Sequence, residues 1–435
     1  KGSMSSALDI SGKAMAPILN DSKPKLKQLD GMRGLLCIGV IAINCNLYNT
    51  GANTLVGFFL IQSGLTAYLA YGDKTWDDEF RLSFFKRRSI RLLPMLIVSS
   101  FWQLFCSAFH IEIKDGEGFF GNVFSLIFLL SPLCCIPCMY RNLITFLVLM
   151  WCGSLTNGPG WYVAALLVLS VYFLPKLLAK YGEKWASAPP SWGLLLIFAL
   201  AEGLQYGIAL VAYYLTNKNE NVWYWVTAAI YLGLPPLCRL VTFLFGLHIG
   251  RWAKFEVKVD RSAEPVWLKE ARTLVPMLAT FLVVFFMHGA FISEYHSHDP
   301  YPASPLLWSA VHMIHPFNVL AIICGLVMAP ESMVSKLLAS KPLLVLADLS
   351  YAMYLLHWGV ITLYVVFTDK QWISIHGNPF GDDDFESEIT VPDFFLVVAI
   401  TTGISFPVTK WVEPAVRAWV KKRIGEGPQP SAGEV

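Results

Sequence analysis

The chain has 435 residues, of which 55% are hydrophobic and only 15% charged. This composition is too apolar for a soluble domain with an ordinary surface, so we expect lipid to surround much of the protein. The formal net charge of +2 provides neither a basic field for nucleic acid nor an acidic disordered arm for a partner.

Apolar segments follow one another almost without a break from Gly34 to Val412. Windows of roughly 17 to 25 apolar residues are typical of membrane spans. They occur near 34–50, 54–72, 92–111, 119–138, 141–156, 161–179, 190–216, 222–252, 274–292, 306–328, 343–367 and 391–412. We therefore predict an all-α, polytopic transmembrane bundle of roughly ten to twelve helices. The predicted organisation is a cytoplasmic polar segment at 1–29, one transmembrane domain at 30–420 and a cytoplasmic tail at 421–435.

Cationic clusters next to the spans predict the topology, because Lys and Arg are enriched in cytoplasmic loops. The clusters are Lys23, Lys25 and Lys27 before the first span, Lys86, Arg87, Arg88 and Arg91 before the third, and Lys421, Lys422 and Arg423 after the last. We expect both termini in the cytoplasm and an even number of spans. The first 29 residues lack the apolar core of a cleaved signal peptide.

Arg33 and Asn44 are polar residues inside the first predicted span, where such groups are costly. They are eleven residues apart. Eleven steps of about 100° return to within roughly 20° of the starting face while rising about 16 Å. Arg33 is expected at the cytoplasmic mouth, with Asn44 on the same face near mid-membrane. Either the Arg snorkels and the Asn bonds a neighbouring helix, or the two line a functional site.

The segment Phe84–Arg91 places four cations just before the third predicted span. Arg88 and Arg91, at i and i+3, share one face of a helix. Such a cluster can simply set topology. Alternatively, a fork of guanidinium groups at the membrane surface is a natural receptor for the pyrophosphate and ribose phosphate of coenzyme A.

A polar stripe occurs in the apolar span near 343–367. Ser350, Tyr354 and His357 fall at i, i+4 and i+7, which is one face of a helix. A single buried His is more often a satisfied core residue than a catalyst. A stripe of three such residues equally favours a polar cavity inside the bundle.

In this order, the motifs resemble the acyltransferase-3 family of multi-span membrane acyltransferases. The likeness begins at Leu29-Asp30-Gly31-Met32-Arg33-Gly34, which matches the family's LDGLRG-like start. Its further landmarks are Gly57–Gly64, Arg88-Ser89-Ile90-Arg91 with Pro94, Gly160-Trp161-Tyr162, Arg239 with Phe243–Gly246, Ser350–His357 and Glu413-Pro414. Together these landmarks cover nearly the whole chain.

The resemblance implies a cytosolic acyl-CoA donor, commonly acetyl-CoA, and an acceptor hydroxyl or amine on a sugar, lipid, polymer or small metabolite. In the family, the position eleven residues after the Arg is a His that acts as general base. Here that position is Asn44, whose amide cannot take a proton near neutral pH. Three accounts fit: an engineered inactivation, since Lys1-Gly2-Ser3 before Met4 is typical of cloning; a natural enzyme with another base, such as His357; or a homologue that has lost catalysis.

We therefore predict a membrane acyltransferase that moves an acyl group, expected to be acetyl, from acyl-CoA to a hydroxyl or amine. The alternative is a non-catalytic homologue or a transporter with the same fold, which Asn44 favours and the retained RxxR cluster opposes. No metal is expected, because no His, Asp or Glu group has ligand spacing within one span. No nucleic-acid partner is expected, because the composition is that of a membrane protein and the net charge is only +2. The predicted catalytic residues are Asn44, Arg33 and His357, and the predicted donor-binding residues are Arg87, Arg88, Arg91, Ser63, Trp161 and Tyr354.

Overall fold

A computed structural model describes residues 26–45, 52–110, 160–216, 235–295, 305–368 and 389–424. Within these ranges every regular element is a helix, which confirms the all-α prediction for this part of the chain. The predicted spans 119–138 and 141–156, and the cations Lys23 and Lys25, lie outside the described residues.

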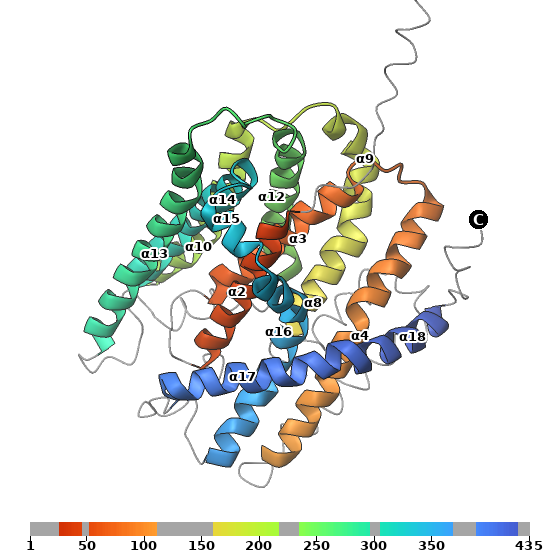
Figure 1. Ribbon diagram of the computed structural model, residues 1–435, viewed down its shortest axis with the longest axis vertical. Helices are drawn as coiled ribbons and strands as arrows, with labels where there is room; N and C mark the ends of the chain where they lie inside the picture. The colour runs from red at the N-terminus through yellow and green to blue at the C-terminus, as the bar shows by residue number, and fades with distance from the viewer. Residues whose placement is uncertain are drawn as a thin grey trace, which may run out of the picture.

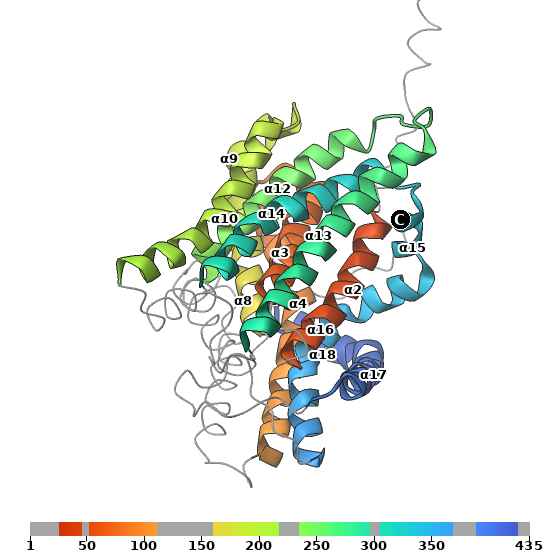
Figure 2. The same ribbon diagram turned by 90° about the vertical axis from the view of Figure 1, so that its left-hand side faces the viewer.

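The helices keep close to the predicted spans, and Figures 1 and 2 show their arrangement. Those of the first half are α2 (Lys27–Asn44), α3 (Ala52–Tyr71), α4 (Asp78–His110), α8 (Gly160–Leu167), α9 (Leu174–Ala186) and α10 (Trp192–Leu215). Those of the second half are α12 (Pro235–Glu256), α13 (Val266–Tyr295), α14 (Pro305–Met328), α15 (Met333–Leu338), α16 (Lys341–Thr368), α17 (Val391–Pro407) and α18 (Glu413–Ile424). Short π-helical segments join α8 to α9 (Val168–Phe173) and α17 to α18 (Val408–Val412).

Five helical stretches in the described part of the chain are long and apolar enough to cross a membrane. They are Asp78–Cys106, Ala165–Ala186, Trp192–Leu215, Lys341–Thr368 and Val391–Lys422. Shorter apolar helices occupy Leu55–Tyr71 and Met313–Met328. The fold is thus that of a membrane helical bundle, although the predicted count of ten to twelve spans is not reached by these stretches.

Contacts between helix ends show which ends lie together in the bundle. Near Arg33, Gln28 of α2 donates to the carbonyl of Leu326 on α14 at 3.0 Å. Lys254 at the end of α12 pairs with Asp73, which follows α3. At the opposite end, the Tyr364 hydroxyl at the end of α16 bonds Asp393 in the first turn of α17.

The buried apolar residues form two clusters, and α2, α3 and α12 contribute to both. One draws most of its residues from α2, α3, α4, α8 and α16, and the other draws most from α3, α10, α12 and α14. Figure 1 shows α10, α13 and α14 grouped on one side of the bundle, away from α4 and α18. In Figure 2, α17 is seen nearly end-on beside α16. The first cluster surrounds the polar residues that the sequence singles out.

Glycines allow α3 and α12 to approach until their backbones touch. A Cβ atom added at Gly246 of α12 would overlap the carbonyl oxygen of Ile61 on α3, and one added at Gly250 would lie 2.6 Å from the carbonyl oxygen of Leu65. Backbone atoms cannot move aside as a flexible side chain can. The spacing of these two helices therefore depends on the absence of side chains at these positions.

We predict that Gly246→Ala destabilises the bundle by about 1–3 kcal/mol, the usual cost of overpacking a tight interior. Thermal unfolding of the purified protein in detergent measures the effect. Gly403→Ala on α17 is the matched control, because a Cβ there meets nothing within 4 Å. Helix propensity alone favours Ala over Gly by about 1 kcal/mol, so the control should be neutral or stabilising. Equal unfolding temperatures for the two variants would contradict the close contact.

Candidate active site

Helices α2 and α16 pack side by side and run in the same direction. Arg33 near the start of α2 meets Ser350, and Asn44 at its end meets His357, seven residues further along α16. Gly34 permits this approach, because a Cβ there would lie 2.9 Å from the backbone nitrogen of Ala347. The two helices thus bring Asn44 to His357 and place Arg33 at the other end of the same interface; these three are the predicted catalytic residues.

Arg33 is half-buried and bound on three sides. Its Nε donates to the Ser350 hydroxyl at 3.2 Å, and one terminal nitrogen donates to the Ala347 carbonyl at 3.0 Å. The other terminal nitrogen lies 3.5 Å from the carboxylate of Asp30, one helical turn earlier. These contacts hold the guanidinium at one end of the interface between α2 and α16, here called the seam. Arg33 is therefore fixed against α16 rather than snorkelling freely.

Asn44 and His357 form the other end of the seam, and both are buried. The amide nitrogen of Asn44 lies 2.9 Å from His357 Nε2 and also donates to the Val40 carbonyl at 3.0 Å. His357 Nδ1 lies 2.7 Å from the Tyr354 carbonyl, an acceptor, so Nδ1 carries the proton. Nε2 then has the lone pair and accepts a hydrogen bond from the Asn44 amide. The imidazole is neutral in this arrangement.

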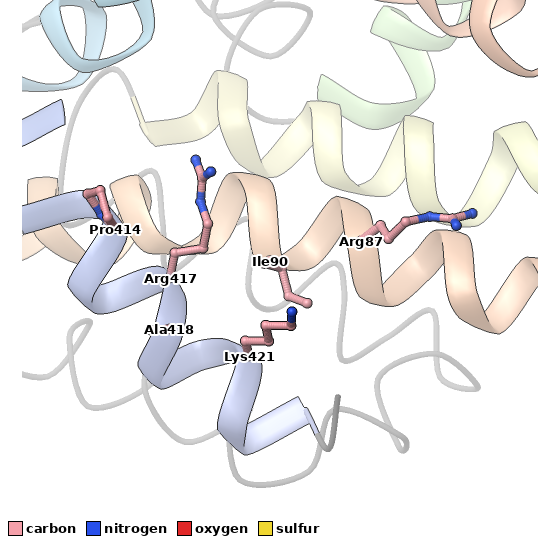
Figure 3. Close-up of a pocket in the computed structure, with 6 residues that line it drawn as sticks. All are labelled: Arg87, Ile90, Pro414, Arg417, Ala418 and Lys421. Atoms are coloured by element: carbon pink, nitrogen blue, oxygen red, sulfur yellow. The ribbon is translucent and has the colours of Figure 1, made fainter. Parts of the chain in front are cut away.

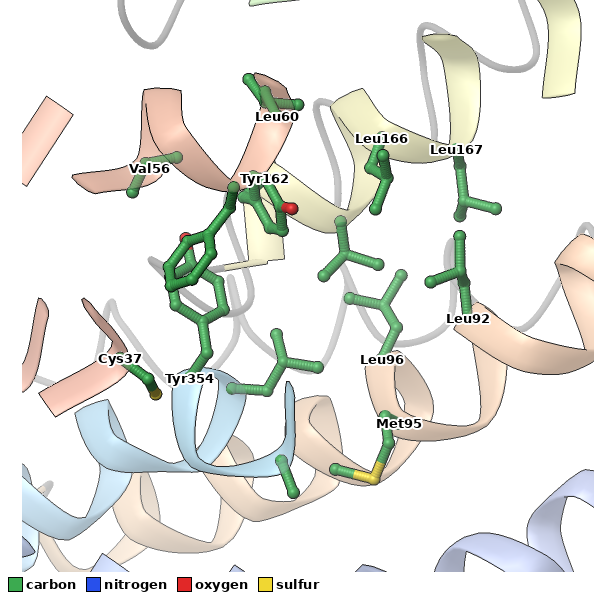
Figure 4. Packing of buried hydrophobic residues seen from close by; sticks show 14 of the residues in the cluster. Cys37, Val56, Leu60, Leu92, Met95, Leu96, Tyr162, Leu166, Leu167 and Tyr354 are labelled. Atoms are coloured by element: carbon green, nitrogen blue, oxygen red, sulfur yellow. The ribbon is translucent and has the colours of Figure 1, made fainter. Parts of the chain in front are cut away.

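Aromatic rings gather beside Tyr354, which lies between Ser350 and His357 on α16, and Figure 4 shows Tyr162 of α8 next to Tyr354. Their centroids are 5.3 Å apart in an edge-to-face arrangement, and the Phe59 ring lies 6.1 Å and 6.2 Å from them. The Tyr162 hydroxyl lies 3.4 Å from the hydroxyl of Ser63 on α3. Ser63 and Tyr354, both predicted donor-binding residues, are thus bridged by Tyr162.

Trp161 is the α8 residue predicted to bind the donor, and it lies in the first turn of that helix, as expected. The side chain of Trp161 lies outside the described part of the structure. Its neighbour Tyr162 is the α8 residue that faces Ser63 and Tyr354. The Gly160-Trp161-Tyr162 motif contained this signal, since a Tyr buried in a bundle usually has a partner for its hydroxyl.

The arginines of α4 face two different directions. Arg88 is half-buried, and its Nε is enclosed without a hydrogen-bond partner among the described residues. Both Arg88 and Arg91 lie within electrostatic range of Tyr351, whose hydroxyl donates to the Leu92 carbonyl at 2.9 Å. Arg87 instead is exposed, and it lines a hollow beside α18 with its guanidinium over the Phe80 ring. The structure therefore brings Arg88 close to the aromatic lining and separates Arg87 from it.

A buried ion pair between α10 and α12 was missed by the sequence reasoning. A carboxylate oxygen of Glu202 lies 3.8 Å from a guanidinium nitrogen of Arg239, and the two side chains are only 5% and 1% exposed. Thr242 donates to the same carboxylate at 2.6 Å, and Gln205 donates to it at 2.9 Å. Arg239 lies within electrostatic range of Tyr354, so this pair adjoins the site. The sequence does contain a signal for this pair: Glu202 is the single acidic residue in the apolar segment 192–215.

Within the described ranges, no group of three or more His, Cys, Asp and Glu side chains is placed to hold a metal ion. The chemistry available at the seam is hydrogen bonding, one neutral imidazole and the positive charges of arginines. Such a set can orient an acceptor group and stabilise negative charge.

The fold and this seam define a polytopic helical membrane protein with a buried polar site. The sequence pattern of the family described as "Acyltransferase domain" matches residues 26–410. The chain belongs to this acyltransferase family, as its motifs predicted.

Curated relatives carry the same kind of name. The chain is 24% identical over 364 residues to the O-acetyltransferase OatA of Staphylococcus aureus, covering 80% of this chain and 52% of the relative. It is 24% identical over 353 residues to the peptidoglycan O-acetyltransferase OatA of Listeria monocytogenes, covering 79% and 50%. The chain thus spans about half the length of these relatives. No solved structure matches it significantly.

We predict that Glu202→Leu destabilises the protein by about 3–5 kcal/mol, because it leaves the buried Arg239 charge without its carboxylate. The double variant Glu202→Leu/Arg239→Met should recover much of this loss, since it removes both charges. Thermal unfolding in detergent is the measurement. Glu183→Leu, at an exposed carboxylate of α9, serves as control and should change little. A double variant as unstable as Glu202→Leu would assign the effect to packing instead of charge.

Proposed function

We propose that this protein is a membrane O-acyltransferase that moves an acetyl group from cytosolic acetyl-CoA to a hydroxyl of a sugar-containing acceptor. The observation that carries the proposal is the hydrogen bond between His357 and position 44, where the family has its base. Membership of the acyltransferase family supports the reaction class. The names of the relatives, two of which are O-acetyltransferases and one of these acting on peptidoglycan, support an acetyl group and a polymer hydroxyl.

The proposed base is a histidine at position 44, with His357 as the residue that positions it. The Asn44 amide nitrogen is attached to Cγ, as Nδ1 is in a histidine side chain. A histidine here would donate its Nδ1 proton to His357 Nε2, which is held ready as an acceptor by the bond from Nδ1 to the Tyr354 carbonyl. The lone pair on Nε2 of the histidine at position 44 would then face the acceptor.

The reaction is an ordinary acyl transfer. The base removes the proton of the acceptor hydroxyl as its oxygen bonds the thioester carbonyl carbon. The carbon–sulfur bond then breaks, and the departing CoA sulfur takes up a proton. Asn44 keeps the hydrogen bond to His357 but has no lone pair basic enough to accept the proton. The chain as it stands therefore retains the architecture of the site and lacks its base.

We predict that Asn44→His raises CoA release from acetyl-CoA by about 10²–10⁴-fold, the usual contribution of a general base. Purified protein in detergent is assayed with a panel of hydroxylated sugars and lipids. In the Asn44→His background, His357→Phe should lower the rate again, because it removes the Nε2 acceptor while preserving ring size. The control is His248→Phe in the same background, since His248 is a buried His packed between the rings of Trp185 and Phe198, outside the seam.

The other outcomes separate the competing accounts. Activity with Asn44 in place that disappears in His357→Phe would make His357 the base of a natural enzyme. Absence of both turnover and acetyl-CoA binding in every variant would favour a non-catalytic homologue or transporter. Asn44 is the feature that keeps this second candidate in consideration.

The donor is proposed to bind through Arg88 and Arg91. Each is a cation without a carboxylate partner among the described residues, and Arg88 points toward the aromatic lining of the seam. Guanidinium groups bind phosphate oxygens strongly because both partners are charged and the fork geometry matches. This arrangement would bring the thioester toward Tyr162 and Tyr354 while the phosphates stay at the membrane surface.

Isothermal titration with CoA tests the donor site. Arg88→Gln and Arg91→Gln should each weaken binding by about 10- to 100-fold, because a hydrogen bond to a charged group contributes about 1.5–3 kcal/mol. Arg81→Gln on the same helix removes an equal charge that already pairs with Asp78 at 3.0 Å, so it should leave affinity unchanged. Unaltered CoA affinity in the Arg88 and Arg91 variants would refute this donor site.

The proposed orientation places the Arg33 end of the bundle in the cytoplasm. Lys254, Arg251 and Lys336 gather at this end, as the positive-inside rule requires of a cytoplasmic face. Both termini would then be cytoplasmic.

A further inference from the structure

A hollow lined by cations lies between α4 and α18, on the side of α4 that Arg87 faces. Its volume is about 350 Å³, and Figure 3 shows the side chains that line it. They are Arg87, Ile90, Pro414, Arg417, Ala418 and Lys421. Three of these residues are cations and none is an acid. The hollow therefore combines positive charge with an apolar floor.

The charges around this hollow are only partly neutralised. Arg417 pairs with Glu413, one turn earlier on α18. Arg87 lies over the Phe80 ring, 5.4 Å from its centroid, and neither it nor Lys421 pairs with a carboxylate of the described chain. Figure 3 shows Arg417 and Lys421 extending from α18 toward α4, with Lys421 reaching toward Ile90, whereas the Arg87 guanidinium extends along α4 away from them. An anion in the hollow would thus meet the cations of α18, and Arg87 of α4 lines the same hollow.

The location of the hollow matches the surface of a membrane. Lys421 is at the end of the candidate span Val391–Lys422, and Arg87 precedes the apolar part of Asp78–Cys106. Trp411 and Trp419, on the same helical rod as Lys421, are 63% and 43% exposed, and exposed Trp is enriched at the level of lipid headgroups. Cations at this level attract phosphate groups.

We propose that the hollow formed by Arg87, Arg417 and Lys421 is a phosphate-binding site at the membrane surface. Two sources can supply the phosphate: the headgroup of an anionic phospholipid, or the phosphates of CoA. The apolar floor and the exposed tryptophans suit a lipid, whose glycerol backbone would contact Ile90 and Pro414. Binding here would fasten α18 to α4 by bridging cations that otherwise repel each other. The site stands whether or not the chain transfers acyl groups.

The test compares two variants of equal charge in detergent. The site variant is Arg87→Gln/Arg417→Gln/Lys421→Gln, and the control is Lys180→Gln/Lys184→Gln/Lys258→Gln, at exposed lysines distant in sequence. Native mass spectrometry measures binding of phosphatidylglycerol and of uncharged-headgroup phosphatidylcholine, and titration calorimetry measures CoA. We expect binding of phosphatidylglycerol by the site variant to be at least about tenfold weaker than by the control, with phosphatidylcholine unaffected.

Each result has a definite meaning. Loss of phosphatidylglycerol binding alone identifies a lipid site, and loss of CoA binding alone identifies the donor's phosphates as the ligand. Equal binding of both ligands by the site and control variants overturns the proposal. Because removing Arg417 leaves Glu413 without its partner, the double variant Arg87→Gln/Lys421→Gln provides the same comparison with that pair intact. Its matched control is Lys180→Gln/Lys258→Gln.

Discussion

The close approach of α2 to α16 is the contact on which the candidate site depends. Gly34 lets the two backbones come together, and their parallel direction places one end of α2 opposite Ser350 and the other opposite His357. A side chain at Gly34 would push the helices apart and lengthen both polar contacts. The spacing of α2 and α16, and with it both polar contacts of the seam, therefore depends on the absence of a side chain at Gly34.

Burial constrains every polar group in this bundle. A guanidinium or carboxylate surrounded by apolar helices must find its hydrogen-bond partners inside the protein, since lipid provides none. Arg33 meets this demand with a serine, a backbone carbonyl and Asp30, and Glu202 meets it with Arg239, Thr242 and Gln205. Both arrangements tie neighbouring helices together. Polar residues thus specify which helices pair, while the apolar clusters provide most of the contact area.

Much of this seam could be predicted from helical periodicity. The eleven-residue spacing correctly placed Arg33 and Asn44 on one face, and the i, i+4, i+7 stripe correctly grouped Ser350, Tyr354 and His357 on α16. Periodicity along one helix does not show which other helix that face contacts. The Asn44–His357 pair joins residues 313 apart in the chain, and Glu202 meets Arg239 across two helices. Such partners depend on tertiary packing, which a repeat along one helix leaves undetermined.

The adjacent residues Arg87 and Arg88 of α4 face different parts of the protein. Adjacent residues differ in direction by about 100°, so Arg87 and Arg88 cannot face the same neighbour. Arg88 turns inward toward Tyr351 and Tyr162, whereas Arg87 lines the hollow beside α18 and places its guanidinium over the Phe80 ring. The cationic segment Phe84–Arg91 therefore carries positive charges on two different faces of α4. The proposed donor site at Arg88 and the proposed phosphate site at the hollow therefore lie on different sides of α4.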